Sequence, residues 1–237
     1  VIALTETKLG ECTQRSLKRI LKKRGWIAHW GAPCDLVQRK DTKTSSIFNA
    51  RHGGVGILTR NGRGAQLAPR RTTRQNWLYN TKRWLHLIYT IKDSKSTINI
   101  FVIYGHPNAA QNDQARKENE QLLTIALEEM MDAGSCPSFM LGDFNTPPEL
   151  SDTLSAALDT GRVIDLHHSW CEDEGTEPEP TCFLTTKSRG TRLDLILANR
   201  PAAQVCQNTI VLSGTGIPTH KPIRTFGDFG QFKGTYI

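Results

Sequence analysis

Alternating apolar and polar residues predict most of the strands in this chain. The alternation over residues 84–89 and again over 97–104 predicts two strands, joined across 92–96 as a hairpin. The apolar run 138–141 predicts a buried strand, and residues 53–58 predict a glycine turn that leads into another. Further strands are expected at 181–183, 192–197 and 207–212.

Three segments instead repeat their apolar residues at helical spacing. Residues 16–21 form an amphipathic helix with a basic face that stops at Gly25, and residues 112–133 form a longer helix capped by Asn112 or Asp113. A short helix carries Leu150, Leu154 and Leu158, while the Arg-rich segment 60–74 is expected to be a loop. Strands mixed with few helices favour an α/β (α+β) fold of two packed sheets with helices outside.

The length of the chain favours a single domain over residues 1–237. Its first residues, Val1-Ile2-Ala3-Leu4, already look like a core strand. We therefore expect the segment to lack the first N-terminal strand of its domain, and with it one or two residues of the site.

The net charge of +7 and the pI of about 9.2 favour a polyanionic partner such as nucleic acid, although an ordinary basic surface would give the same values. Six scattered cysteines form no Cys-x-x-Cys pair, which indicates reduced thiols in an intracellular protein and no zinc site. The histidines offer no metal set either, and the adjacent His167 and His168 would face opposite sides of a strand. No apolar stretch is long enough to cross a bilayer, so no membrane partner is expected.

The strongest chemical signal is Gly142-Asp143-Phe144-Asn145, which follows the buried strand 138–141. Open α/β folds place their sites at the carboxyl ends of strands. A carboxylate and a carboxamide two residues apart can share one cleft there, and they suit the activation of water next to a phosphate. The alternative is an Asx turn that caps a helix beginning near Pro147.

Five short segments share the order of motifs in a known superfamily. They are Leu4-Thr5-Glu6-Thr7, Tyr104-Gly105-His106-Pro107-Asn108, Gly142-Asp143-Phe144-Asn145, Arg192-Leu193-Asp194 and Pro218-Thr219-His220-Lys221-Pro222. In this order the chain resembles the endonuclease/exonuclease/phosphatase superfamily, and within it the apurinic-endonuclease-like domain of non-LTR (LINE-type) retrotransposons. The resemblance implies a DNase I-like, four-layered sandwich of two packed mixed β-sheets flanked by helices.

The resemblance also implies catalytic roles for individual residues. Asp143 would activate the attacking water or protonate the leaving oxygen, and Asn145 would hold the phosphate. His220 would donate to a phosphate oxygen, and Asp194 would orient it; alone, Asp194 could merely pair with Arg192 or Arg189. Tyr104 would hydrogen-bond the scissile phosphate, where the alternative is a turn whose hydroxyl meets water.

Other residues would hold the metal and the substrate. By resemblance Glu6 is the main ligand of Mg²⁺, with Mn²⁺ as a substitute; otherwise it is a solvated residue at a strand end. Asn108 would help orient the site. Thr181 and Arg189 lie in a segment resembling the surface hairpin that such nucleases place on DNA, although basic tips are often only solvated turns.

Three departures from the family pattern bear on function. Gly105 and His106 put two residues between Tyr104 and Pro107, where one is common. Thr219 replaces the Asp that usually precedes the His, so a second metal position is weakened or lost. Thr191 stands where repair enzymes often carry an aromatic residue, which disfavours abasic-site repair.

The sequence therefore predicts a Mg²⁺-dependent phosphodiesterase that nicks DNA and leaves a 3′-hydroxyl. The resemblance implies a retrotransposon polyprotein with a reverse transcriptase domain on the same chain, acting in the nucleus. The alternatives are a decayed domain that only binds nucleic acid, an abasic-site repair nuclease, and a phosphatase of the same superfamily.

Overall fold

The computed structural model describes residues 1–40, 47–60, 64–91, 96–183 and 189–228. Within these ranges no helix is both long and apolar enough to span a membrane. All six cysteines lie in the described part and carry free thiols.

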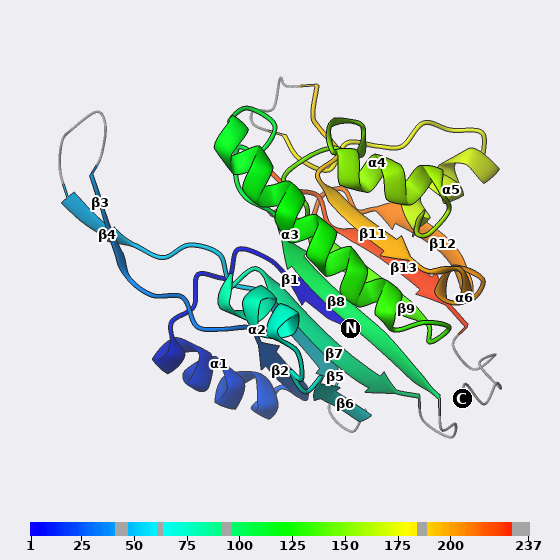
Figure 1. Cartoon of the computed structure of the whole chain (residues 1–237). Helices are drawn as coiled ribbons and strands as arrows, with labels where there is room; N and C mark the ends of the chain where they lie inside the picture. Colours follow the sequence, from blue (N-terminus) through cyan, green and yellow to red (C-terminus); the bar gives the residue numbers. More distant parts are fainter. Residues whose placement is uncertain (41–46, 61–63, 92–95, 184–188, 229–237) are drawn as a thin grey trace.

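A six-stranded mixed sheet forms the centre of the structure (Figure 1). Its order is β10 (Ile164–Asp165), β11 (Asp194–Ala198), β9 (Ser138–Asp143), β8 (Thr97–Tyr104), β7 (Trp84–Thr90) and β6 (Gly64–Leu67). Strands β8 and β9 run parallel, and the other neighbours run antiparallel. The predicted hairpin of residues 84–89 and 97–104 is confirmed as β7 and β8, which pair antiparallel.

Three smaller sheets accompany it. An antiparallel sheet has the order β1 (Ile2–Leu4), β5 (Gly56–Arg60) and β2 (Trp26–Trp30). Strands β12 (Cys206–Val211) and β13 (Ile223–Gly227) form a second antiparallel pair. The pair β3 (Val37–Lys40) and β4 (Ile47–Ala50) projects from the body of the molecule as an arm (Figure 1).

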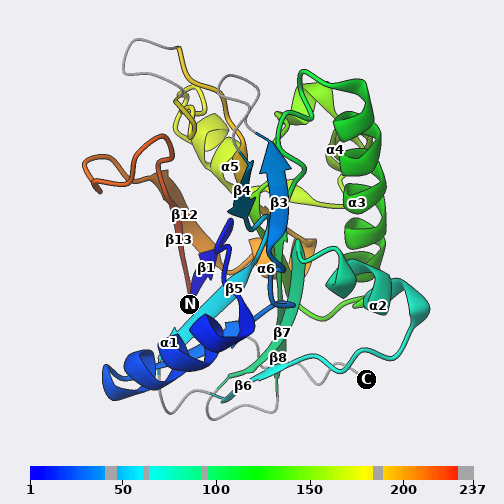
Figure 2. The same cartoon turned by 90° about the vertical axis from the view of Figure 1, so that its left-hand side faces the viewer.

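Helices lie outside the sheets on both sides. Helix α1 (Glu11–Lys23) packs on β2, while α2 (Thr73–Asn80) and α3 (Asp113–Asp132) lie on the far side of the six-stranded sheet (Figure 2). The remaining helical elements are η1 (Pro148–Leu150), α4 (Asp152–Asp159), α5 (Leu166–Asp173) and α6 (Arg200–Ala203). Asn112 caps α3, as one of the two predicted caps, by accepting the N–H of Ala115 at 2.9 Å.

Alternating side chains of β8 fill two separate cores. Ile100, Val102 and Tyr104 pack toward the three-stranded sheet, in a cluster that also holds Ile57 of β5. Phe101 and Ile103 face the other way, toward the buried apolar side of α3. This period of two buries both faces of the central sheet and confirms the predicted fold class of packed sheets flanked by helices.

Several local predictions need correction. The expected loop 60–74 contains β6 and the start of α2, which begins with a capping box of Thr72 and Gln75. The short helix after the site is interrupted: Leu150 ends η1 and is exposed, and Ser151 then caps α4.

Two segments that were expected to be strands, at residues 167–168 and 181–183, have other structures. His167 and His168 lie in α5, because Asp165 accepts both of their backbone N–H groups and starts a helix. Residues 181–183 form only isolated bridges, in which Cys182 pairs with Thr191 and with His220.

Candidate active site

Three strand ends place the principal candidate side chains side by side. Tyr104 ends β8 opposite Asp143 at the end of β9, because the two strands are parallel and in this register. Asp194 begins the antiparallel strand β11 and also lies opposite Asp143. The carboxyl ends of β8 and β9 and the amino end of β11 therefore meet at one edge of the sheet.

Gly142 allows this close approach. Its φ of 148° disfavours side chains, and an added Cβ would lie 1.9 Å from the carbonyl oxygen of Ile103. Any larger residue would push β9 away from β8, and Asp143 away from Tyr104.

Asp143 and Asn145 form a compact turn of two polar side chains. The backbone N–H of Asn145 donates to Oδ1 of Asp143 at 2.9 Å, and its Nδ2 donates to Oδ2 at 3.2 Å. The same Nδ2 donates to the carbonyl of Gly105 at 3.1 Å, and Asn145 holds a φ of 53°. The Asx-type turn thus exists, but neither side chain caps a helix, since Ser151 serves α4.

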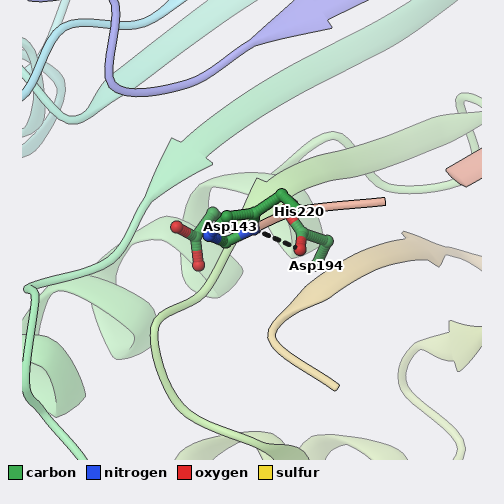
Figure 3. Close-up of side chains that lie close together, drawn as sticks. All are labelled: Asp143, Asp194 and His220. Carbon is green, nitrogen blue, oxygen red and sulfur yellow. Dashed lines mark hydrogen bonds and ion pairs between the residues drawn. The ribbon is translucent and has the colours of Figure 1, made fainter. Parts of the chain in front are cut away.

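His220 lies against the carboxylate of Asp194. The His220 Nδ1 is 2.8 Å from Oδ2 of Asp194, as the dashed line in Figure 3 shows. Arg192 pairs with the buried Asp165 instead, so it does not compete for Asp194. With Nδ1 engaged, Nε2 is the ring atom left to meet a ligand.

The electrostatics of this cluster favour a neutral Asp143 and a charged His220. Burial raises the pKa of Asp143 to about 7, with a further contribution from the charge of Asp194. The hydrogen bond to Asp194 raises the pKa of His220. Burial, and then the charges of Glu6 and Asp143, raise the pKa of Tyr104.

Glu6 lies at the margin of this cluster. It is exposed, has a φ of 51°, and forms an ion pair with Lys8 at 2.7 Å. Its charge nevertheless contributes to the pKa values of Tyr104, Asp143 and His220, which places it within electrostatic reach of all three. The sequence predicted the metal at Glu6, whereas ligand atoms of Asp143, Asp194 and His220 lie within 4.8 Å of one another.

The donor set fits a hard divalent cation. Asp143 and Asp194 bring carboxylate oxygens together with His220, and the charge of Glu6 also reaches Asp143; Mg²⁺ and similar ions prefer carboxylate ligands. Asp194 and Glu6 both raise the pKa of Asp143, and a bound cation would relieve that repulsion.

The three predicted substrate-binding residues lie in different surroundings. Thr181 is fully buried where the backbone pairs with Thr191, and its Oγ1 accepts the backbone N–H groups of Leu193 at 3.1 Å and Asp194 at 2.9 Å. Asn108 is exposed in a turn with a φ of 64°. Arg189 is exposed and directly follows residues 184–188, which lie outside the described ranges and include the first half of the predicted hairpin tip, residues 187–190. Their roles at a substrate remain predictions.

Thr219 supplies no anionic ligand. Its Oγ1 donates to the carbonyl of Pro218 at 2.6 Å, and the side chain is exposed at a φ of 67°. The backbone carbonyl of Thr219 accepts the N–H of Phe183 at 2.7 Å, which joins this segment to residues 181–183.

The sequence did not reveal Asn119, a fully buried residue of α3. Its Nδ2 donates to the Phe144 carbonyl at 3.0 Å, and its Oδ1 accepts the N–H of His106 at 2.7 Å. It therefore joins the loop after Tyr104 to the loop after Asp143. No local signal marks it, since its partners are 13 and 25 residues away.

Arg83 was missed as well. Its Nη1 donates to the carbonyl of Gly105 at 2.7 Å, and its guanidinium lies 4.8 Å from the centre of the Tyr104 ring. Burial lowers its pKa, and no carboxylate among the described residues forms an ion pair with it. A cation in such a position could take an anionic ligand.

Comparison with solved structures supports the fold. A 3′–5′ exonuclease (NExo) from Neisseria meningitidis is 17% identical, with a TM-score of 0.66 over 96% of this chain and 88% of that one. An AP endonuclease from Archaeoglobus fulgidus is 14% identical, with a TM-score of 0.68 over 95% of this chain and 88% of that one. The catalytic domain of Xenopus laevis APE2 is 15% identical, with a TM-score of 0.64 over 95% of this chain and 82% of that one.

No curated protein sequence matches the chain. The model of the "Endonuclease/Exonuclease/phosphatase family", however, matches residues 1–215. This range includes Glu6, Tyr104, Asp143 and Asp194, and it ends just before His220. The chain belongs to the endonuclease/exonuclease/phosphatase family.

Proposed function

We propose that this domain is a Mg²⁺-dependent phosphodiesterase that nicks DNA, derived from the polyprotein of a LINE-type retrotransposon. One observation carries the proposal: Asp143, Asn145, Asp194, His220 and Tyr104 converge at one edge of the central sheet. Family membership supports hydrolysis of a phosphate ester, and the basic charge of the chain supports DNA as the polyanion.

Asp143 acts on the attacking water. A carboxylate with a pKa of about 7 is near the ideal for a general base at neutral pH, because it is half ionised and still basic enough to take a proton. The water oxygen bonds to phosphorus while its proton moves to Asp143. The bond between phosphorus and the 3′-oxygen breaks on the opposite side, and the leaving oxygen takes a proton from solvent, which gives a 3′-hydroxyl and a 5′-phosphate.

His220 stabilises the charge that develops on the phosphate. Asp194 holds Nδ1, so the raised pKa keeps a proton on Nε2 for donation to a non-bridging oxygen. The Tyr104 hydroxyl stays protonated for the same purpose, because its pKa is raised. Asn145 keeps Asp143 aimed through its two hydrogen bonds, and Arg83 adds a positive charge beside Tyr104.

Glu6 would hold the metal ion beside Asp143, whose carboxylate then stays available to the attacking water. When bound, a divalent cation supplies charge neutralisation at the phosphate and at the leaving oxygen. Since Thr219 contributes no carboxylate, we propose a single ion, Mg²⁺ or Mn²⁺.

The biological setting follows from the proposed product. A 3′-hydroxyl at a nick is the primer that a reverse transcriptase on the same polyprotein would extend, and this reaction would take place in the nucleus. Extending the reading frame in both directions tests that part of the proposal.

Nicking of supercoiled plasmid, with Mg²⁺ or with EDTA, tests the activity itself. We expect open circles only with Mg²⁺ and only when Asp143 is intact; if the segment is inactive, the assay is repeated with a version extended upstream. Binding of DNA without nicking in the extended protein would replace the proposal with a decayed domain that only binds DNA. Thr219, which replaces the usual Asp, is the residue that motivates this alternative.

A second candidate activity is removal of a 3′-phosphate. One similar structure is described as a 3′-phosphatase bound to a product DNA hairpin, at 17% identity. Release of inorganic phosphate from a 3′-phosphorylated primer, at a rate above that of plasmid nicking, would favour this activity.

A further inference from the structure

Helix α1 and the residue after it carry a dense group of basic side chains. Residues 11–24 carry six cations and one carboxylate, a net of +5 out of +7 for the whole chain. The remaining residues together carry only +2. Segment 60–74 also carries five arginines, but it is divided between β5, β6, α2 and the residues that join them, and its Arg74 pairs with carboxylates of α3.

These cations share one side of the helix. The basic face comprises Arg15, Lys18, Arg19, Lys22 and Lys23, whose spacing of three and four residues places them on one side of a helix. All five are exposed. Arg15 pairs with Glu11, but the other four form no ion pair with any carboxylate of the described ranges.

The opposite side of α1 is already occupied. Leu17 and Leu21 are half-buried, and the helix packs on β2. This packing puts α1 on the outer side of the three-stranded sheet, across both sheets from α3 (Figure 2). The basic face is therefore a surface separate from the edge that carries Asp143 and His220.

From this arrangement we infer that the basic face of α1 binds the phosphate backbone of the nucleic acid outside the active site. The face spans about 12 Å along the helix axis, at a rise of 1.5 Å per residue. That length matches about four phosphates of one strand of a duplex. Its charges would anchor the flanking DNA without taking part in the chemistry, so the inference rests on the proposed function only for its choice of polyanion.

An anionic membrane is the competing partner for a basic amphipathic helix. Such binding needs a free apolar face. The leucines of α1 are half-buried against β2, and the large apolar residue of α1 that stays exposed is Ile20, at 49%. The charge pattern without an apolar face favours nucleic acid.

Salt-dependent DNA binding tests the inference. The variant K18Q/R19Q/K22Q/K23Q keeps good helix formers and removes four charges. A matched control, R71Q/K117Q/R162Q/R200Q, removes four exposed cations from other elements. Affinity for a labelled duplex of about 30 base pairs is measured by anisotropy in EDTA over a range of salt, so that no cleavage intervenes.

For the α1 variant we expect a Kd raised ~10-fold or more at low salt, and a log–log salt slope reduced by about 3 to 4. The control should change the slope by less than about 1. Equal effects of the two variants would overturn the inference, because net charge alone would then explain binding. Loss of vesicle binding to phosphatidylserine membranes in the α1 variant, with DNA binding intact, would also overturn it.

Plasmid nicking in Mg²⁺ separates this inference from the proposed function. A wild-type protein that binds DNA through α1 but never nicks leaves the inference standing and removes the nuclease. If the protein nicks plasmid but wild type, the α1 variant and the control variant have equal salt slopes, the nuclease stands and the inference about α1 falls.

Discussion

Replacing Asp143 with Asn should stabilise the folded protein at pH 8 while abolishing its catalysis. Asp143 is only 6% exposed, and its pKa rises from an ordinary 3.8 to about 7 on folding. A carboxyl group with a raised pKa contributes stability that is complete below about pH 3.8 and is lost as the pH rises through about 7. At pH 8 the folded wild-type protein must therefore keep an ionised carboxylate in a site that disfavours it.

The size of the effect follows from the shift in pKa. A rise of the Asp143 pKa from 3.8 to about 7 corresponds to about 4 kcal/mol of free energy of unfolding. Asn keeps the acceptor for the N–H of Asn145 but loses the acceptor for its Nδ2, at a cost of about 1 kcal/mol. We expect D143N to be more stable than wild type by roughly 2 to 3 kcal/mol at pH 8 without divalent cations.

Urea unfolding of both proteins in EDTA at pH 5 and pH 8 measures this difference. The gain should shrink at pH 5, where the wild-type carboxyl group is protonated. Mg²⁺ at pH 8 should stabilise wild type more than D143N, because only wild type keeps the full negative charge of the cluster. A variant equally destabilised at both pH values would refute the reasoning, since the carboxylate would then contribute ordinary hydrogen bonds and no repulsion.

Three further substitutions test how the site is held together. N119A leaves the N–H of His106 and the buried carbonyl of Phe144 without the Asn119 side chain. It should therefore lower kcat far more than L123A, a similarly buried change on α3, when steady-state kinetics compares the two at equal stability. T181V should lower kcat with little change in KM and shift the pH profile of His220, whereas T181S, which keeps the hydroxyl, should restore both; an unrestored T181S would mean that the methyl group matters instead. G142A should abolish folding as seen by circular dichroism, because the new Cβ meets the Ile103 carbonyl at 1.9 Å, and a folded G142A would show that β8 and β9 can separate.

The central layers were predictable because their signal is local. Strands β7, β8 and β9 and helix α3 are long or strongly apolar, so period and burial agree over many residues. The segment 60–74 was wrongly predicted to be a loop because of its many arginines, although the capping pair Thr72 and Gln75 indicates the start of α2. Helix α5 has a similar weak signal, the cap Asp165, in a segment too short for a clear period.

The site separates into motif residues and supporting residues for a physical reason. Asp143, Asp194 and His220 could be named from the sequence because the motifs carry them, and the structure brings them together. Asn119 and Thr181 act through backbone groups of other segments, so nothing near them in sequence records what they hold.

The sequence gives the total charge of the chain directly, but it does not show where that charge lies on the surface. A net charge of +7 alone indicates a polyanion and would be expected to line the substrate cleft. Helix α1 and Arg24 instead carry +5 away from the edge with Asp143, where burial, and then the charge of Asp194, raises the pKa of that carboxyl. An acidic centre repels a polyanion unless a cation neutralises it, so under the proposed function α1 would attract the DNA and the edge with Asp143 would cleave it. This division explains how the same chain can be basic overall and still keep an anionic site suited to a divalent metal ion.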